Sequence, residues 1–167
     1  VGSKCVGSAF NQPLDNSLVV CIVLTHITFG CCFNQPLDNS LNKCSSLTHI
    51  EFGHNFAQPL GNALNNCTKL TSLVFGFYFS QPLANSLNNC TLLTHLTFGC
   101  CFSQSLDNVF DNCSFLTHLE LGYCFNQKVD LPYNIRSLGL NSNEGNYIDY
   151  LPDSVEELRL GTQFNLK

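Results

Sequence analysis

The stretch FNQPLDNSLNKCSSLTHIEFG, residues 33–53, is repeated along the chain with few changes. FNQPLDNSL also stands at residues 10–18, and QPLANSLNNCTLLTHLTFG stands at residues 81–99. The copies keep one register, with equivalent residues 23 positions apart: Phe10, Phe33, Phe56, Phe79, Phe102 and Phe125; Cys21, Cys44, Cys67, Cys90 and Cys113. A repeat of this length is typical of a solenoid in which each copy forms one layer.

One half of each copy has the pattern of a half-buried β-strand. In residues 47–52, the apolar Ile50 and Phe52 alternate with the polar His49 and Glu51. This period of two places apolar and polar side chains on opposite faces of a strand. We expect eight such strands, from residues 4–6 to residues 155–160, paired in parallel between successive copies.

The other half of each copy has the spacing of a short helix. Leu60, Leu64 and Cys67 lie at positions i, i+4 and i+7, which form one apolar stripe on about two helical turns. The cysteines are expected to fill the core as free thiols, and the glutamines to form a buried hydrogen-bonded ladder. The prediction is an α/β leucine-rich-repeat solenoid, with a parallel sheet on the concave face and short helices or extended segments on the convex face.

The repeat makes residues 1–167 a single domain, in which the last units are shortened. After Phe125, Leu-Pro segments replace the helical pattern, and we expect them to form turns or extended chain. Because the motif starts again at the end of the chain, we expect a longer parent with more units or a separate cap. The expected units are a partial unit 1–9, five full units within 10–124, shortened units 125–147 and 148–163, and a further start at 164–167.

The composition excludes two classes of partner and indicates a compartment. Charged residues are 11% of the chain and the net charge is −5, so no basic surface can neutralise a row of phosphates. No apolar run approaches the roughly 18 residues of a membrane span. We therefore expect neither a nucleic acid nor a membrane as partner. Free buried thiols favour a reducing, cytoplasmic location.

The repeat resembles a known family. F-N-Q-P-L followed by L-T-H-L-T-F-G, with the variant L-P-x-[SN]-[VI]-x-x-L-x-L-G, is similar to FNIP repeats, an unusual leucine-rich class. The N-x-C-[TS]-x-L-T-x-[LI] portion is also similar to BspA-like leucine-rich repeats. FNIP proteins occur in amoebae and in the giant viruses that infect them, so the resemblance implies such a source and, for a virus, the host cytoplasm. Some carry an F-box ahead of the repeats, which implies substrate recognition for a ubiquitin ligase.

The polar strand positions are the candidate binding surface. One side of the sheet packs on the core, and the exposed concave side is the usual binding surface of a solenoid. The candidate partner-binding residues are His26, Thr28, His49, Glu51, Ser72, Val74, His95, Thr97, His118, Glu120, Arg136, Glu157 and Arg159.

Two groups of residues allow other chemistry. His26 and His49 should be neighbours about 5 Å apart, as should His95 and His118, and such pairs are potential zinc ligands. The alternative, an exposed Thr-His pair that meets solvent or a partner, is favoured because no H-E-x-x-H or C-x-x-C motif is present. Cys101 and Cys124 occupy equivalent turn positions, so both a disulfide and free thiols are open. We expect no cofactor and no resident metal.

The leading hypothesis is a scaffold for protein–protein interaction that binds a protein partner through the concave sheet face. An enzyme is not expected, because the sequence has no nucleophile elbow or phosphate-binding loop and the histidines are periodic. One alternative is the substrate-recognition region of a longer F-box ubiquitin-ligase receptor. The other alternative is a structural module that associates with itself through open terminal repeats.

Overall fold

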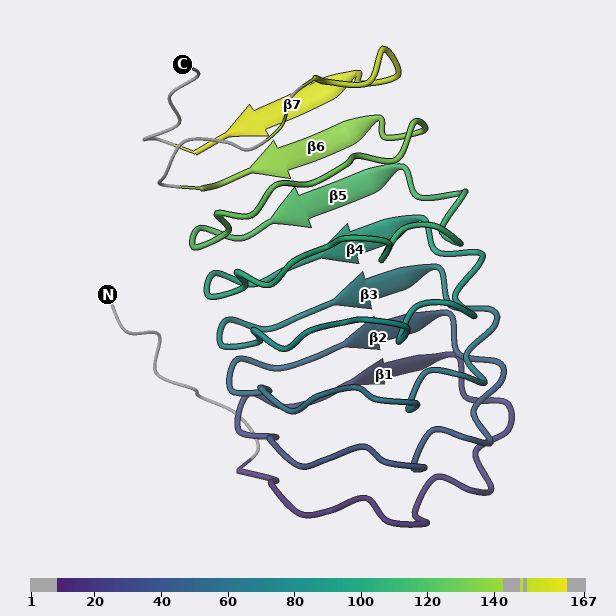
Figure 1. Ribbon diagram of the computed structural model, residues 1–167. Helices are drawn as coiled ribbons and strands as arrows, with labels where there is room; N and C mark the ends of the chain where they lie inside the picture. Colours follow the sequence, from purple (N-terminus) through teal and green to yellow (C-terminus); the bar gives the residue numbers. More distant parts are fainter. Residues whose placement is uncertain (1–8, 143–147, 149, 162–167) are drawn as a thin grey trace.

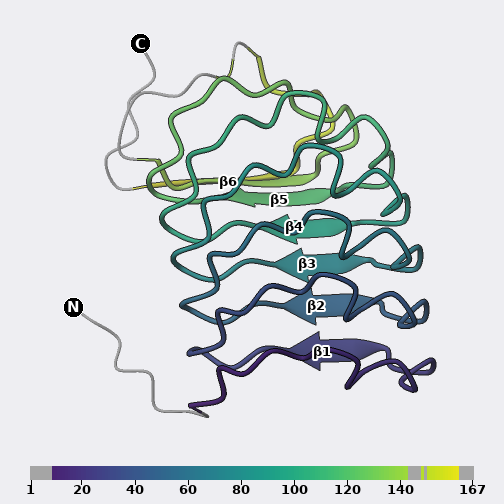
Figure 2. The same ribbon diagram turned by 60° about the horizontal axis from the view of Figure 1, so that its bottom comes forward.

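The chain folds into a parallel β-solenoid, shown as a computed structural model that describes residues 9–142, 148 and 150–161 (Figure 1). Its strands form one seven-stranded sheet in the order of the sequence. Each strand pairs in parallel with the strand of the next layer, so each repeat contributes one layer (Figure 2). The strands are β1 (His26–Thr28), β2 (His49–Glu51), β3 (Ser72–Val74), β4 (His95–Thr97), β5 (His118–Leu121), β6 (Ser137–Leu140) and β7 (Glu157–Leu160).

The predicted helices are wrong: among the described residues the chain opposite the sheet consists of turns. Successive turns are closed by bonds from Ala63 N–H to the Leu60 carbonyl (2.9 Å) and from Cys67 N–H to the Leu64 carbonyl (2.9 Å). Gly61, inside the first of these turns, has a φ of 50°, and this left-handed residue interrupts any helix. The turns still return Leu60, Leu64 and Cys67 to the core, which is why the apolar spacing resembled a helix.

Two ladders of stacked phenylalanine rings fill the core beside the sheet. Phe52, Phe75 and Phe98 stack at 5.5 Å between ring centroids, while Phe56, Phe79 and Phe102 stack at 6.1 and 6.2 Å. On the outer face of the sheet, stacked histidine rings are only 4.0 to 4.2 Å apart. The stacked rings are therefore closer together on the outer face of the sheet than in the body of the solenoid.

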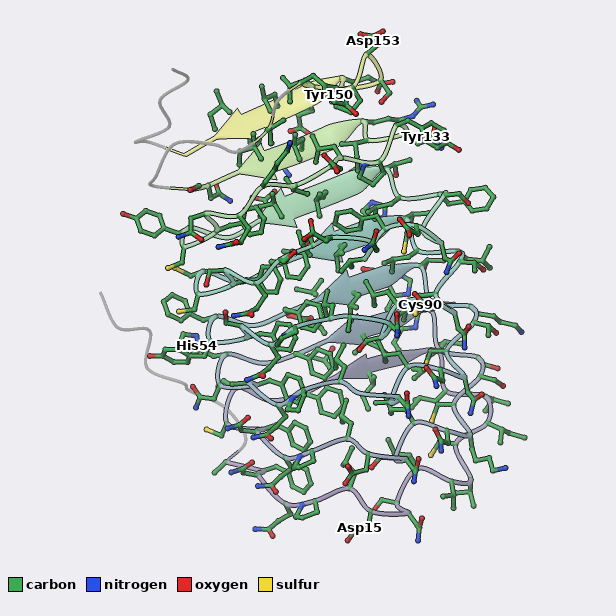
Figure 3. The ribbon with its side chains drawn as sticks, viewed as in Figure 1. Asp15, His54, Cys90, Tyr133, Tyr150 and Asp153 are labelled. Atoms are coloured by element: carbon green, nitrogen blue, oxygen red, sulfur yellow. The ribbon has the colours of Figure 1, made fainter. Side chains whose placement is uncertain are left out.

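Four of the five cysteines of the predicted column lie in the core, whereas Cys21 is half-buried. Cys44, Cys67, Cys90 and Cys113 are buried, and every cysteine among the described residues is a free thiol. Burial raises the pKa of the Cys67 and Cys90 thiols to about 12, so these side chains stay neutral and act as small apolar groups. Cys90 lies on the opposite side of the molecule from His54, which follows the end of β2 (Figure 3).

The glutamines form a ladder between layers, but they are half-buried rather than buried as predicted. Gln58 Nε2 donates to Asn34 Oδ1 (3.2 Å), and Gln81 Nε2 donates to the Ala57 carbonyl (2.9 Å). Gln58 and Gln81 each follow the turn after a strand, and both side chains are partly exposed to solvent. The ladder therefore ties neighbouring layers together at the edge of the core.

The last layers differ from the regular ones. β7 is an edge strand, and its side chains Leu158 and Leu160 are 39% and 46% exposed. The predicted strand at residues 4–6 and the predicted unit start at 164–167 lie outside the described residues, as does part of the two shortened units. In the described part of the chain, no helix has the length and apolarity to cross a membrane.

Candidate binding surface

The strand register gathers the predicted residues into two columns on the outer face of the sheet. Within each strand they alternate with buried residues such as Ile50, Leu73 and Leu96, so both columns face away from the core. We call this surface the sheet face. Its columns are His26, His49, Ser72, His95, His118, Ser137 and Glu157, and Thr28, Glu51, Val74, Thr97, Glu120, Gly139 and Arg159.

Arg136 is the one predicted residue outside these columns. It lies one position before β6, where its N–H donates to the Thr117 carbonyl (2.8 Å). Its guanidinium forms an exposed ion pair with Glu156 at 3.0 Å, beside the sheet face. Conversely, Ser137 and Gly139 lie within the columns although they were not predicted as site residues, and the register alone was enough to find them.

A threonine orients each histidine of the first column. Nδ1 of His49 and of His95 lies 2.8 Å from the hydroxyl of the preceding threonine. The Thr94 hydroxyl donates its proton to the Thr71 carbonyl (2.9 Å), and the Thr48 hydroxyl donates to the Thr25 carbonyl (3.0 Å).

A hydroxyl has only one proton to donate. In the neutral imidazole, the ring must therefore donate from Nδ1 to the threonine oxygen, which leaves Nε2 as an acceptor. The same pair of bonds is present at Thr117 and His118, at 3.3 and 2.8 Å. The sheet face consequently presents hydrogen-bond acceptors of known orientation from β2, β4 and β5.

The histidine rings stack in two pairs, as the register predicted. The centroids of His26 and His49 are 4.2 Å apart with 9° between the ring planes, and those of His95 and His118 are 4.0 Å apart with 12°. In stacked rings the Nε2 lone pairs run side by side within the ring planes. They do not converge on one ion, as zinc bonded at about 2.0–2.1 Å requires. The geometry therefore argues against zinc bound between two stacked rings.

The fold opposes protonation of the His95 imidazole. Partial burial lowers its pKa, and charge on His118 and then on His49 lowers it further. A neutral His95 avoids placing two positive rings in contact. At neutral pH the His95 ring accordingly remains an uncharged hydrogen-bond acceptor.

The far end of the sheet face carries ion pairs that cross layers. Arg159 Nη2 lies 2.7 Å from Glu120 Oε2, and Arg159 Nη1 lies 2.8 Å from Glu157 Oε1. The first pair joins β5 to β7 across Gly139 of β6. A Cβ at this glycine would overlap the Glu120 carboxylate, so the absence of a side chain there makes room for the bridge.

Glu157 has a second partner. The Ser137 hydroxyl donates to Glu157 Oε2 at 2.8 Å. This bond, followed by the bond and the charge of Arg159, lowers the pKa of the Glu157 carboxyl. The side chains at this end are therefore held in an extended network of polar contacts.

One strand per repeat, a parallel sheet and a leucine-rich core define the protein as a leucine-rich-repeat solenoid. More narrowly, the chain belongs to the family of the BspA type leucine-rich repeat region, whose profile matches in six copies over residues 14–117 and 38–148. The comparison with curated proteins finds no match. Repeats of this class generally serve as interaction or scaffold modules, and their fold is typically non-catalytic.

Proposed function

We propose that the protein is a non-enzymatic scaffold that binds a protein partner through the sheet face. The observation that carries this proposal is that the side chains of the sheet face are already fixed in position. Contacts within the protein hold them before any partner binds. Thr-His bonds orient the histidines, ring stacking pairs them, and Arg159 joins Glu120 to Glu157.

Such order favours binding because association costs less when interface side chains have little freedom to lose. The chain also has few long flexible cations, with 7 lysines and arginines in all. The Nε2 acceptors and the carboxylates favour a partner segment rich in hydrogen-bond donors, such as hydroxyl, amide and guanidinium groups. We propose that this binding takes place in the cytoplasm, or in the host cytoplasm if the source is a virus.

A pair of matched variants tests the proposal. Thr97→Arg places a long side chain in the middle of the sheet face, whereas Asn88→Arg places the same side chain on an exposed turn opposite the sheet. Each variant and the original protein are immobilised, exposed to an extract of the producing cells, and their bound proteins quantified by mass spectrometry. Thr97→Arg should lose at least one partner that Asn88→Arg retains. Identical bound sets for all three proteins would contradict the proposal.

The F-N-Q-P-L motif supports membership of the FNIP-repeat class. That membership favours a more specific form of the proposed function, which is substrate recognition for a ubiquitin ligase. In a longer parent with an F-box, the sheet face would select substrates for a ubiquitin ligase. The full open reading frame tests this version, since a parent without a recruiting domain would remove it.

The exposed leucines of β7 favour one further candidate, self-association. Leu158 and Leu160 expose apolar surface on β7, which is the edge strand of the sheet among the described residues. Edge strands of this kind readily pair with another chain. Light scattering over a concentration series distinguishes the candidates, because a monomer at all concentrations rules out assembly and leaves the scaffold intact.

A further inference from the structure

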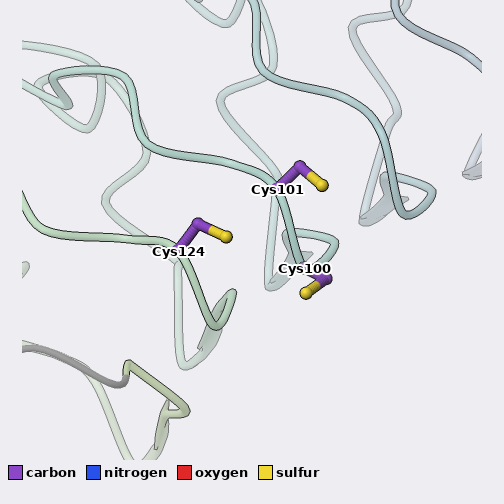
Figure 4. Close-up of side chains that lie close together, drawn as sticks. All are labelled: Cys100, Cys101 and Cys124. Carbon is purple, nitrogen blue, oxygen red and sulfur yellow. The ribbon is translucent and has the colours of Figure 1, made fainter.

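Three cysteines gather in the turns that follow β4 and β5. Cys100 and Cys101 lie on one turn and Cys124 lies on the next (Figure 4). The Cys124 N–H donates to the Cys100 carbonyl at 2.8 Å, so the backbone holds the two turns in register. The three Sγ atoms all lie within 4.8 Å of one another.

This cluster does not follow from the repeat alone. The equivalent turn positions are occupied by Cys31 and Cys32 after β1, and by His54 and Asn55 after β2. The His54 ring stacks on Phe77 at 4.8 Å and meets the edge of Tyr78 at 5.1 Å. Among the residues that the structure describes, three thiols lie close together only in the turns after β4 and β5.

The spacing of the sulfurs suits a metal ion. With metal–sulfur bonds of about 2.3 Å, ligand sulfurs around one ion lie roughly 4 Å apart. The observed separations, all within 4.8 Å, exceed that spacing by less than about 1 Å. Cys100 and Cys101 are half-buried and Cys124 is exposed, so an ion can enter from solvent.

We propose that Cys100, Cys101 and Cys124 bind one thiophilic d10 metal ion, copper(I) or zinc(II), through three thiolates. Soft sulfur ligands select these ions over magnesium or calcium. Copper(I) is satisfied by the three thiolates, whereas zinc(II) takes water or another external ligand in a fourth position. The bound ion joins the layer of β4 to the layer of β5.

Binding exchanges protons for the ion. In the free protein, burial raises the pKa of the Cys100 and Cys101 thiols, and repulsion from a Cys124 thiolate raises it further. Because a thiol must lose its proton to bind the ion as a thiolate, each ion that binds displaces the protons that the cysteines still carry. No electron is transferred, and affinity rises with pH.

A disulfide between Cys101 and Cys124 is the competing outcome. It requires the two sulfurs to approach to about 2.0 Å and would leave Cys100 alone. Thiol counting on denatured protein, isolated without oxygen, distinguishes the two. All thiols free supports the proposal, and a Cys101–Cys124 bond in that sample overturns it.

The direct test titrates the reduced protein with copper(I) buffered by a coloured chelator and, separately, with cobalt(II) as the probe of a zinc-type site. We expect one equivalent of at least one ion to bind, seen as chelator competition or as thiolate-to-cobalt charge-transfer absorption that zinc(II) abolishes. Binding of copper(I) alone assigns a copper site, and a tetrahedral cobalt spectrum assigns a zinc site. Failure of both ions to bind at one equivalent overturns the proposal.

Matched variants locate the site. Cys124→Ser should lower the affinity by more than about tenfold, because a missing ligand costs at least as much as a missing outer partner. The double variant Cys31→Ser, Cys32→Ser changes two thiols at equivalent turn positions and should bind as the original does. If the double variant loses as much affinity as Cys124→Ser, or if Cys124→Ser loses none, the assignment is wrong. Neither result bears on the sheet face.

Discussion

The regular layers of β2, β3 and β4 and the charged layers of β6 and β7 hold their surface side chains in different ways. In the regular layers, hydrogen bonds connect each histidine to a threonine and each threonine to the layer before it. In the charged layers, Arg159 connects carboxylates of β5 and β7. One backbone register therefore supports both a network of threonine–histidine hydrogen bonds and a network of ion pairs.

The cores of the two regions differ as well. Phe79 lies between Phe56 and Phe102 with no exposed surface, while Leu158 of β7 is 39% exposed. A middle layer packs on two neighbours, and the layer of β7 packs on one described neighbour. The same kind of substitution should consequently have unequal effects.

The largest expected difference comes from truncating a core side chain in each region. Phe79→Ala should lower the free energy of unfolding by about 3–5 kcal/mol, since it opens a cavity between two stacked rings. Leu158→Ala should cost less than half as much, because solvent already reaches that side chain. Urea denaturation followed by circular dichroism measures both. Equal losses would show that β7 is packed as tightly as the middle layers.

Next in size is a comparison of two glycines. A Cβ at Gly76 would overlap the backbone carbonyl of Gly53, whereas the three atoms nearest to a Cβ at Gly139 all belong to the Glu120 carboxylate. Backbone cannot move aside without separating the layers, but a glutamate side chain can.

We expect Gly76→Ala to cost about 1–3 kcal/mol or more, as overpacking does. Gly139→Ala should cost at most about 1 kcal/mol, the usual upper limit for an exposed ion pair such as Glu120–Arg159. Thermal unfolding of both variants provides the measurement. A greater loss of stability for Gly139→Ala than for Gly76→Ala would contradict the argument that backbone overlap costs more than displacement of the Glu120 side chain.

A smaller effect is expected in the turns opposite the sheet. Ala84 has a φ of 40° where its equivalent Gly61 has a φ of 50°. A left-handed alanine costs about 1–2 kcal/mol, and the greater freedom of glycine in the unfolded chain offsets about 0.5–1 kcal/mol of that. Ala84→Gly should raise the midpoint of urea unfolding, and Gly61→Ala should lower it. A decrease for Ala84→Gly would contradict the left-handed turn.

The smallest expected effect concerns pH. The folded pKa of His95 lies below its ordinary value of 6.5, so the unfolded chain takes up the proton first. Stability from this histidine is therefore complete above pH 6.5 and decreases as pH falls from there through the folded pKa. His95→Gln should flatten this part of the stability profile, while Asn88→Gln, on an exposed turn, should leave it unchanged. An unaltered profile for His95→Gln would show that the stacked histidine pair does not cause the loss of stability at low pH.

Much of the fold could be predicted because the pattern in the strand half of the repeat is compatible with only one conformation. Alternation at His49, Ile50 and Glu51 defines a strand face, and the constant period then sets the register of its neighbours. The pattern in the turn half is compatible with two conformations. The spacing of Leu60, Leu64 and Cys67 is satisfied by a helix and also by consecutive turns, and a left-handed φ at Asp38 or Ala84 decides between them. Alanine rarely adopts that conformation, and aspartate adopts it in only a minority of cases, so neither residue predicts it.

The site shows the same division. Contact between His95 and His118 follows from the register, so it could be predicted. The Nδ1–H tautomer could not, because it depends on where the Thr94 hydroxyl points. Likewise, the register suggests that Cys101 and Cys124 are neighbours, but the approach of Cys100 depends on the direction of its side chain.

The central claim is that the sheet face is where a protein partner binds. Its most direct test replaces Thr97 on the sheet face, or Asn88 on an opposite turn, with a photoreactive amino acid in the producing cells. The two proteins are illuminated, purified and compared for covalent adducts. We predict partner adducts from position 97 and few or none from position 88. Adducts in equal yield from both positions, or from position 88 alone, would contradict the claim.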